Sequence, residues 1–149
     1  MTPLRQQGLS LIEVMIALAV FSFGLLALAA LMASGLKYNT SALHRSYATS
    51  QAYDMADRMR ANRKGLGFYI PLSDSVDPEC FGTETETSCT SEEMAQYDAW
   101  QWNRDNLRLL PEGTGTVSLE SSIYTITISW NDDRDSGTPD VSFIVEFQP

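Results

Sequence analysis

Histidine and cysteine are scarce in this sequence, and their scarcity limits its chemistry. The 149 residues include one histidine, His44, and two cysteines, Cys80 and Cys89. A zinc site needs three or four such ligands close together, so no metal centre is expected. The sequence also lacks the G-x-S-x-G, P-loop and H-E-x-x-H motifs of common enzyme classes. We therefore expect no enzyme and no cofactor, and we expect His44 to be a helix-surface residue rather than a general base.

Basic residues are rare in the C-terminal part of the chain. The stretch from Gly65 to Pro149 contains three basic and sixteen acidic residues, and the whole chain has a net charge of −9. A surface of this charge repels phosphate groups, so a nucleic-acid partner is not expected.

One acidic loop, residues 131–140, can be compared with a calcium site. Asn131, Asp133 and Asp135 alternate as acidic and amide residues do at the start of an EF-hand loop. The glycine comes one residue late, however, and Ser142 stands where a bidentate glutamate is needed. A turn between two strands is the favoured interpretation, with calcium binding as the alternative.

Charge is missing altogether from Val14 to Leu36, a run of 23 residues. About 20 apolar residues can cross a bilayer as a helix, whereas the apolar part of a secretory signal usually has roughly 7–15. A single carboxylate, Glu13, stands directly before the run. A cleaved secretory signal explains neither the length nor Glu13, and a plain single-pass anchor explains the length alone.

Residues 8–13, with the sequence Gly-Leu-Ser-Leu-Ile-Glu, resemble the class III signal of type IV pilins and pseudopilins. The resemblance implies that a prepilin peptidase cuts after Gly8 on the cytoplasmic side and methylates the new N-terminus at Leu9, while the apolar segment is retained. Leu9 replaces the phenylalanine most often found there, and Arg5 is the only basic residue of the leader. Both variations occur in such signals.

The same resemblance implies three segments and a role for Glu13. The expected leader peptide is residues 1–8, the transmembrane and filament-core helix is residues 9–36, and the periplasmic head is residues 37–149. An unpaired carboxylate is costly in an apolar filament core, whereas a paired one is tolerated. Glu13 is therefore expected to meet the N-terminus of a neighbouring subunit and so to set the register of assembly.

A long helix is expected from about Leu9 to Asn62, because no proline interrupts this stretch. Its first half is apolar all round, and its second half is amphipathic. The apolar positions of the second half recur with helical spacing and are Ala48, Ala52, Met55, Ala56 and Met59. We expect this stripe to lie against a sheet, Asp54 and Arg58 to form an i,i+4 pair, and Gly65 and Gly67 to end the helix.

Residues 65–90 are expected to form a loop. Within it, Cys80 and Cys89 are expected to form a disulfide, because the head is exported. Thr90 and Glu93 fit a capping box at the start of a second helix. The large side chains expected on the buried side of that helix are Tyr97, Trp100 and Leu107.

The C-terminal part alternates between apolar and polar residues, as strands do. We expect strands at residues 115–119, 123–130 and 141–147. The expected fold class is therefore α+β, specifically a pilin fold. It consists of a long N-terminal helix packed on a C-terminal antiparallel sheet of three to four strands.

Weaker patches, the helix end at 58–63 and the stretches around Trp100 and Pro111, resemble PilV-type minor pilins (type IV pilus modification proteins). The resemblance implies a single-pass protein of a Gram-negative inner membrane that joins the type IV pilus. Its implied partners are the prepilin peptidase, other minor pilins, the major pilin and a tip adhesin, and its implied role is in pilus biogenesis, twitching motility and adhesion. Two alternatives stay open: an I-type minor pseudopilin of a type II secretion system, and a surface-binding adhesin head with Trp102 and the acidic loops as contacts.

Overall fold

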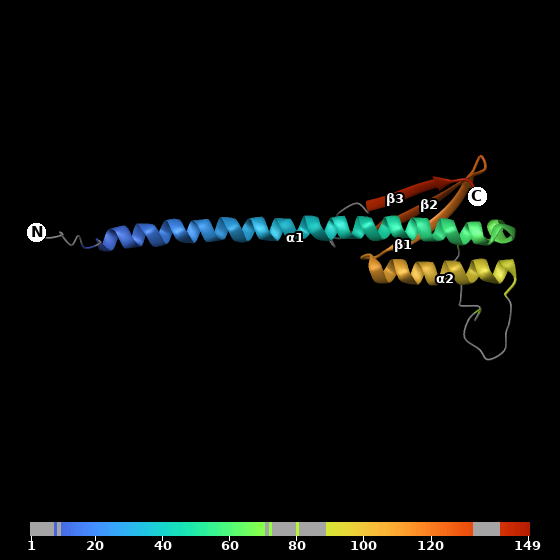
Figure 1. Ribbon diagram of the computed structural model, residues 1–149, viewed down its shortest axis with the longest axis horizontal. Helices are drawn as coiled ribbons and strands as arrows, with labels where there is room; N and C mark the ends of the chain where they lie inside the picture. The colour runs from blue at the N-terminus through green and yellow to red at the C-terminus, as the bar shows by residue number, and fades with distance from the viewer. Residues whose placement is uncertain (1–7, 9, 71, 73–79, 81–88, 133–140) are drawn as a thin grey trace, which may run out of the picture. The chain divides into compact units, whose positions relative to one another are not determined.

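The computed structural model describes residues 8, 10–70, 72, 80, 89–132 and 141–149 (Figure 1). Its elements, in chain order, are α1 (Leu11–Ala61), the short 3₁₀-helix η1 (Arg63–Tyr69), α2 (Ser91–Leu109), β1 (Thr114–Glu120), β2 (Ile123–Trp130) and β3 (Val141–Phe147). The chain divides into two compact units, Met1–Thr40 and Ser41–Pro149, and α1 contributes residues to both.

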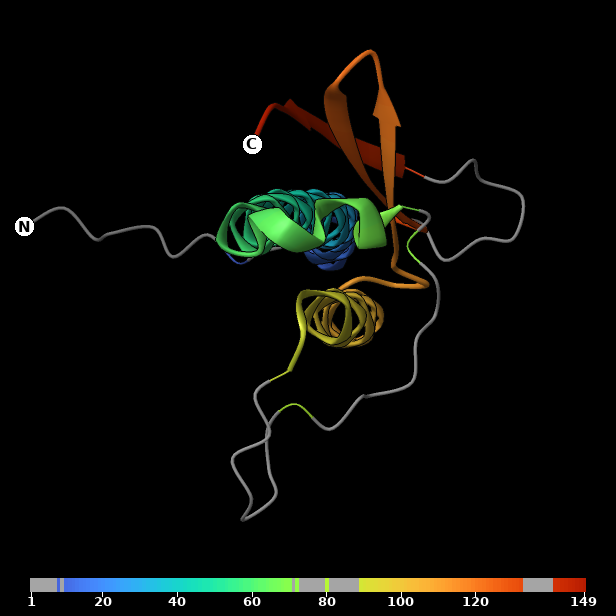
Figure 2. The same cartoon turned by 90° about the vertical axis from the view of Figure 1, so that its right-hand side faces the viewer.

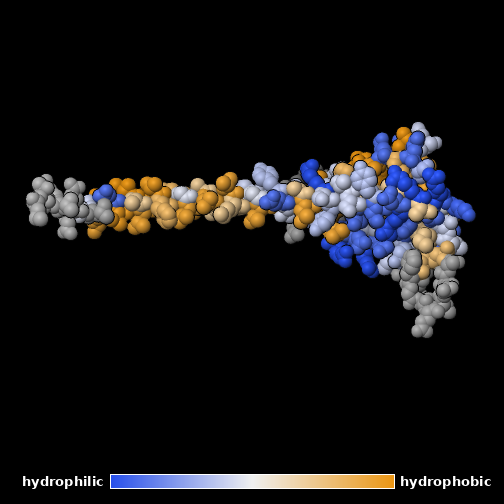
Figure 3. Space-filling view, viewed as in Figure 1, coloured by the Kyte–Doolittle hydropathy of each residue, from blue (hydrophilic) through white to orange (hydrophobic). Residues whose placement is uncertain are grey.

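The first unit consists, from Leu11 to Thr40, of a bare helix. Leucine and alanine, which favour helices, are its commonest residues, and Figure 3 shows a largely apolar surface along it. Every described residue of this unit is exposed, including Phe23 at 72% and Leu31 at 70%. The mean hydropathy of its most apolar window is 2.6, so by length and composition this helix could cross a membrane.

The second unit packs a three-stranded antiparallel sheet against the C-terminal half of α1. The strand order β1-β2-β3 follows the chain, and the register places Val117, Ile126 and Val145 side by side. Ile126, Ile128 and Trp130, on one face of β2, join α1 residues in the same core. Figure 2 shows the C-terminal half of α1 between the sheet and α2, so this half of the helix is covered on two sides.

The α1 side of this core is the apolar stripe that the sequence predicts. Its members are at most 1% exposed and are Ala48, Ala52, Met55, Ala56 and Met59. The small alanine side chains let the helix approach its neighbours closely, and the flexible methionine side chains fill the gaps that remain. The prediction that this stripe packs on the sheet is confirmed.

A two-residue turn joins β1 to β2. Ser121 and Ser122 have φ values of 49° and 69°, and Glu120 pairs with Ile123 across the turn. Two successive positive φ values are typical of a type I′ turn, whose twist matches that of the flanking strands. Serine occupies the left-handed region at a cost of about 1 kcal/mol, which glycine avoids.

The α+β pilin fold predicted from the sequence is confirmed, and β2 and β3 have the predicted bounds. The long helix ends at Ala61, next to the predicted end at about Asn62, but the prediction that Gly65 and Gly67 end it is wrong, because both glycines lie in η1. An added Cβ at Gly65 would collide with the Asn62 side chain and the Ser91 carbonyl, so Gly65 permits close packing rather than ending the helix. The described part of 65–90 contains no fourth strand, and residues 71, 73–79 and 81–88 lie outside the described residues.

Candidate functional site

The N-terminal site begins at Gly8, which is exposed and has open space where a Cβ would stand. Leu9, the expected site of methylation, lies outside the described residues. The Ser10 carbonyl accepts hydrogen bonds from the backbone N–H groups of Glu13 at 3.0 Å and Val14 at 3.3 Å, which starts α1 at Leu11. The peptide bond after Gly8 therefore lies just before a regular helix.

Glu13 lies in the first turn of α1, where a negative side chain is favoured by the positive end of the helix dipole. With Val14, Ala17, Leu18 and Phe21 it lines a shallow hollow on the helix surface. The small Ala17 side chain lies between larger neighbours and creates this depression. Such a hollow can receive an apolar side chain, while the carboxylate that borders it attracts a positive charge.

The predicted disulfide between Cys80 and Cys89 is present, with 5.6 Å between the two Cα atoms. Cys89 directly precedes Thr90, the N-cap of α2, and the predicted capping box is also present. The Thr90 hydroxyl accepts from the Glu93 N–H at 3.2 Å, and the Glu93 carboxylate accepts from the Thr90 N–H at 2.8 Å. The backbone hydrogen bond from Thr90, and then its hydroxyl, lower the pKa of Glu93. The start of α2 is thus fixed by a covalent bond and by its cap.

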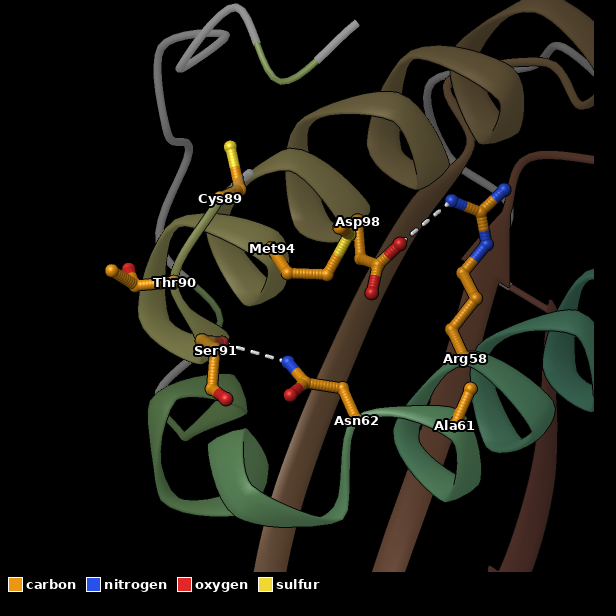
Figure 4. A pocket seen from close by; sticks show the side chains of 8 residues that line it. All are labelled: Arg58, Ala61, Asn62, Cys89, Thr90, Ser91, Met94 and Asp98. Atoms are coloured by element: carbon orange, nitrogen blue, oxygen red, sulfur yellow. Dashed lines mark hydrogen bonds and ion pairs between the residues drawn. The ribbon is translucent and has the colours of Figure 1, made fainter. Parts of the chain in front are cut away.

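A polar network joins the end of α1 to α2 and η1 (Figure 4). The Arg58 guanidinium donates to Asp54 at 2.8 Å, as predicted, and to Asp98 at 3.1 Å. The Tyr69 hydroxyl, which is fully buried, donates to the other Asp98 oxygen at 2.5 Å. Burial and this hydrogen bond raise the pKa of Tyr69. Burial alone would lower the pKa of Arg58, but the two carboxylates outweigh it and raise the pKa.

This network borders an open hollow of about 380 Å³ between α1 and the start of α2. Figure 4 shows its polar groups facing one another, with Asn62 donating to the Ser91 carbonyl at 2.7 Å and Arg58 bound to Asp98. These groups satisfy each other and leave no described acid or base poised toward the hollow. The arrangement is that of a structural junction. It was not predicted from the sequence, because Asp98 lies 40 residues beyond Arg58 along the chain.

The prediction that His44 lies on the helix surface is wrong. His44 is 7% exposed, and its Nδ1 lies 2.8 Å from an oxygen of Asp132, just after β2. Asp132 also accepts hydrogen bonds from the Ser41 hydroxyl and, at 3.2 Å, from the Trp130 indole N–H. Burial would raise the pKa of Asp132, but these hydrogen bonds outweigh it and lower the pKa.

The serine, histidine and aspartate of this cluster do not form a nucleophilic triad. A triad needs the serine hydroxyl to donate to the histidine, whereas Ser41 donates to Asp132. Among the described residues no three His, Cys, Asp or Glu side chains are placed to hold a metal ion. In the acidic loop for which calcium binding is the alternative, Asn131 is buried, and residues 133–140 lie outside the described residues.

The predicted buried side of α2 is wrong. Leu107 is 62% exposed, and Tyr97 and Trp100 are only partly buried. The buried residues of the helix are instead Ala95, Asp98, Ala99, Trp102 and Asn106. Trp102 is fully buried, and its indole N–H donates to the Gln51 carbonyl at 2.8 Å. Trp102 therefore cannot be a surface contact, and this part of the adhesin alternative is wrong.

Comparison with known protein families gives two matches. The model described as type IV pilin Tt1218 matches residues 30–100, and that of the prokaryotic N-terminal methylation motif matches residues 3–29. No curated protein and no solved structure matches the chain. The first model covers the end of the apolar helix and much of the α1–α2 junction, and the second covers the processing signal. Together the two matches support a type IV pilin, of a pilus or a pseudopilus.

Proposed function

We propose that this chain is a minor pilin of the type IV pilus, a structural subunit rather than an enzyme. The observation that carries the proposal is the bare helix from Leu11 to Thr40, which is apolar, exposed throughout its length and continuous with the head. An exposed apolar surface of this length is stable only in lipid or against other apolar helices. A pilin uses both environments in turn, the membrane before assembly and the filament core after it.

Processing acts at Gly8 and Leu9. The peptidase removes residues 1–8 and methylates the new N-terminus, which leaves residues 9–36 as the membrane and filament segment and residues 37–149 as the periplasmic head. The exposed, unobstructed Gly8 beside the start of α1 supports this proposal. The matched methylation motif supports it as well.

Glu13 sets the register between subunits. After cleavage the amine at Leu9 and the carboxylate of Glu13 are four residues apart, or about 6 Å of helix rise. This offset suits a pair formed between subunits that are shifted along the filament axis. The docked subunit then satisfies a carboxylate that would otherwise be unpaired in an apolar core. The hollow beside Glu13 receives an apolar side chain of the neighbour.

Replacing Gly8 by alanine tests the processing step. The substitution should block cleavage, so that the protein keeps its leader. Gly24→Ala is a matched control, because Gly24 also has open space at its Cβ position but lies inside α1. Mass spectrometry of protein from membranes measures the first residue. A Gly8→Ala chain that still begins at Leu9, with a methylated amine, would contradict the proposal.

Replacing Glu13 by alanine tests the register. The variant should enter the membrane normally but copurify poorly with other pilins and restore few pili in a deletion strain. Glu146→Ala is the control, because Glu146 is an exposed glutamate of the head on β3. Normal piliation and normal copurification of Glu13→Ala would count against the proposed role.

The deletion strain also separates a pilus from a secretion pseudopilus. Loss of surface pili and twitching with normal protein secretion supports the minor pilin. Loss of secretion with normal pili supports an I-type pseudopilin instead. The experiment is needed because the matched methylation motif fits both assemblies.

A further inference from the structure

The apolar surface of α1 ends abruptly at two residues suited to a lipid headgroup layer. Lys37 ends the uncharged run, and Tyr38 follows with 74% of its surface exposed. Tyrosine has an apolar ring and a polar hydroxyl, and it is enriched at membrane–water interfaces. A lysine side chain beside it can extend toward phosphate groups while its methylenes stay in the apolar layer.

The spacing of charged residues along α1 matches the thickness of a bilayer. Glu13 and Lys37 are 24 residues apart in a continuous helix, which corresponds to a rise of about 36 Å. The hydrocarbon core of a bilayer is about 30 Å thick. Both charged groups therefore reach the headgroup layers at once when the helix is centred on Leu25, the midpoint between them.

We propose that Lys37 and Tyr38 bind the phospholipid headgroups of the leaflet facing the head, and that this contact places Glu13 in the opposite headgroup layer. The inference rests on the proposed membrane anchoring of the subunit. Its occupant is the phosphate and glycerol region of a bilayer, because the positive charge of Lys37 complements the phosphates and the Tyr38 ring suits the interface.

This placement changes the energetics of assembly. In the membrane the Glu13 carboxylate remains hydrated, so inserting the helix does not carry the penalty of a charge at the bilayer centre. The carboxylate leaves water only when the subunit moves into a filament core. The need for a positive partner therefore arises at assembly and not during storage in the membrane.

A depth profile of the full-length protein in phospholipid vesicles tests the inference. Single cysteines at positions 14, 25, 36 and 38 carry a nitroxide label, since Cys80 and Cys89 are joined to each other and do not react. The relative access of oxygen and of a water-soluble nickel complex reports the depth of each label. We expect Leu25→Cys to be deepest, Val14→Cys and Leu36→Cys to be equally shallow, and Tyr38→Cys to lie at headgroup level.

Each other outcome has a distinct meaning. A label at Tyr38 as accessible to nickel as one at the exposed head residue Tyr53 overturns the headgroup contact. A Val14 label as deep as the Leu25 label overturns the placement of Glu13 at the interface. Both results leave membrane anchoring intact, whereas nickel access at Leu25 itself would overturn anchoring and the proposed function with it.

Discussion

Asp98 is the residue whose loss should most disturb the head. Its side chain is buried and accepts hydrogen bonds from Arg58 at 3.1 Å and from Tyr69 at 2.5 Å. Asp98→Ala leaves the Tyr69 hydroxyl proton without an acceptor, which costs about 1–3 kcal/mol for a buried donor. Arg58 loses one carboxylate but keeps Asp54 and Gln101 and is 21% exposed, so we assign this loss only about 1 kcal/mol.

The summed cost is about 2–4 kcal/mol of the free energy of unfolding. For a unit of roughly 100 residues this lowers the melting temperature by about 10–20 °C. The measurement is thermal unfolding of the full-length protein in detergent, followed by near-ultraviolet circular dichroism of the buried tryptophans. Asp57→Ala is the matched control, because Asp57 is 74% exposed and its pair with Arg60 should contribute less than about 0.5 kcal/mol.

A second substitution checks the assignment of the cost. Adding Tyr69→Phe to Asp98→Ala removes the unsatisfied hydroxyl and should recover about 1 kcal/mol. An Asp98→Ala variant no less stable than Asp57→Ala would refute the reasoning. A double variant less stable than Asp98→Ala alone would show that the hydroxyl finds another acceptor.

Three further variants test the head. Ser122→Gly should raise the free energy of unfolding by about 0.5–1 kcal/mol by relieving the positive φ of 69°, and an unchanged or lower melting temperature would contradict this. Replacing Cys80 and Cys89 by serine should cost about 2–3 kcal/mol in urea unfolding, and free thiols in native protein would exclude the bridge. The lowered pKa of Asp132 adds stability that is complete above about pH 5 and is lost as pH falls through that pKa. Asp132→Asn should thus be less stable at neutral pH and lose less on acidification, and a parallel acid profile would contradict this.

Local patterns predicted most of the fold. The helical repeat of Ala48, Met55 and Met59 identified the buried face of α1, and the alternation in residues 123–130 identified strand β2. These predictions succeeded because one periodic surface of each element packs on one core. The capping box at Thr90 also needed only residues within a single turn.

The prediction of the buried face of α2 is wrong because the large side chains of this helix do not all mark the face that packs on the core. The true face contains the small Ala95 and the polar Asp98 and Asn106, which alternate with Trp102 at helical spacing. Burial of Asp98 depends on Arg58 and on Tyr69, neither of which lies on α2. A search for helical periodicity alone, without regard to side-chain size or polarity, would have placed Trp102 on the buried face.

His44 shows the limit of sequence reasoning more sharply. Its position next to Arg45 indicates a solvated helix surface, and its partner Asp132 lies 88 residues further along the chain. Only the packing of β2 on α1 brings the two side chains together. The roles of Gly8, Leu9 and Glu13 stay predictions, because they depend on a peptidase and on neighbouring subunits.

The first buried residue among those described is His44, which follows more than thirty exposed positions. Substitutions before His44 therefore remove no contact from the hydrophobic core of the head. Selection can adjust the apolar segment to different lipids or neighbours while the melting temperature of the head stays the same. Equally, a subunit whose head is destabilised can stay anchored in the bilayer through its apolar helix, so that membrane fractionation alone would score a misfolded subunit as normal.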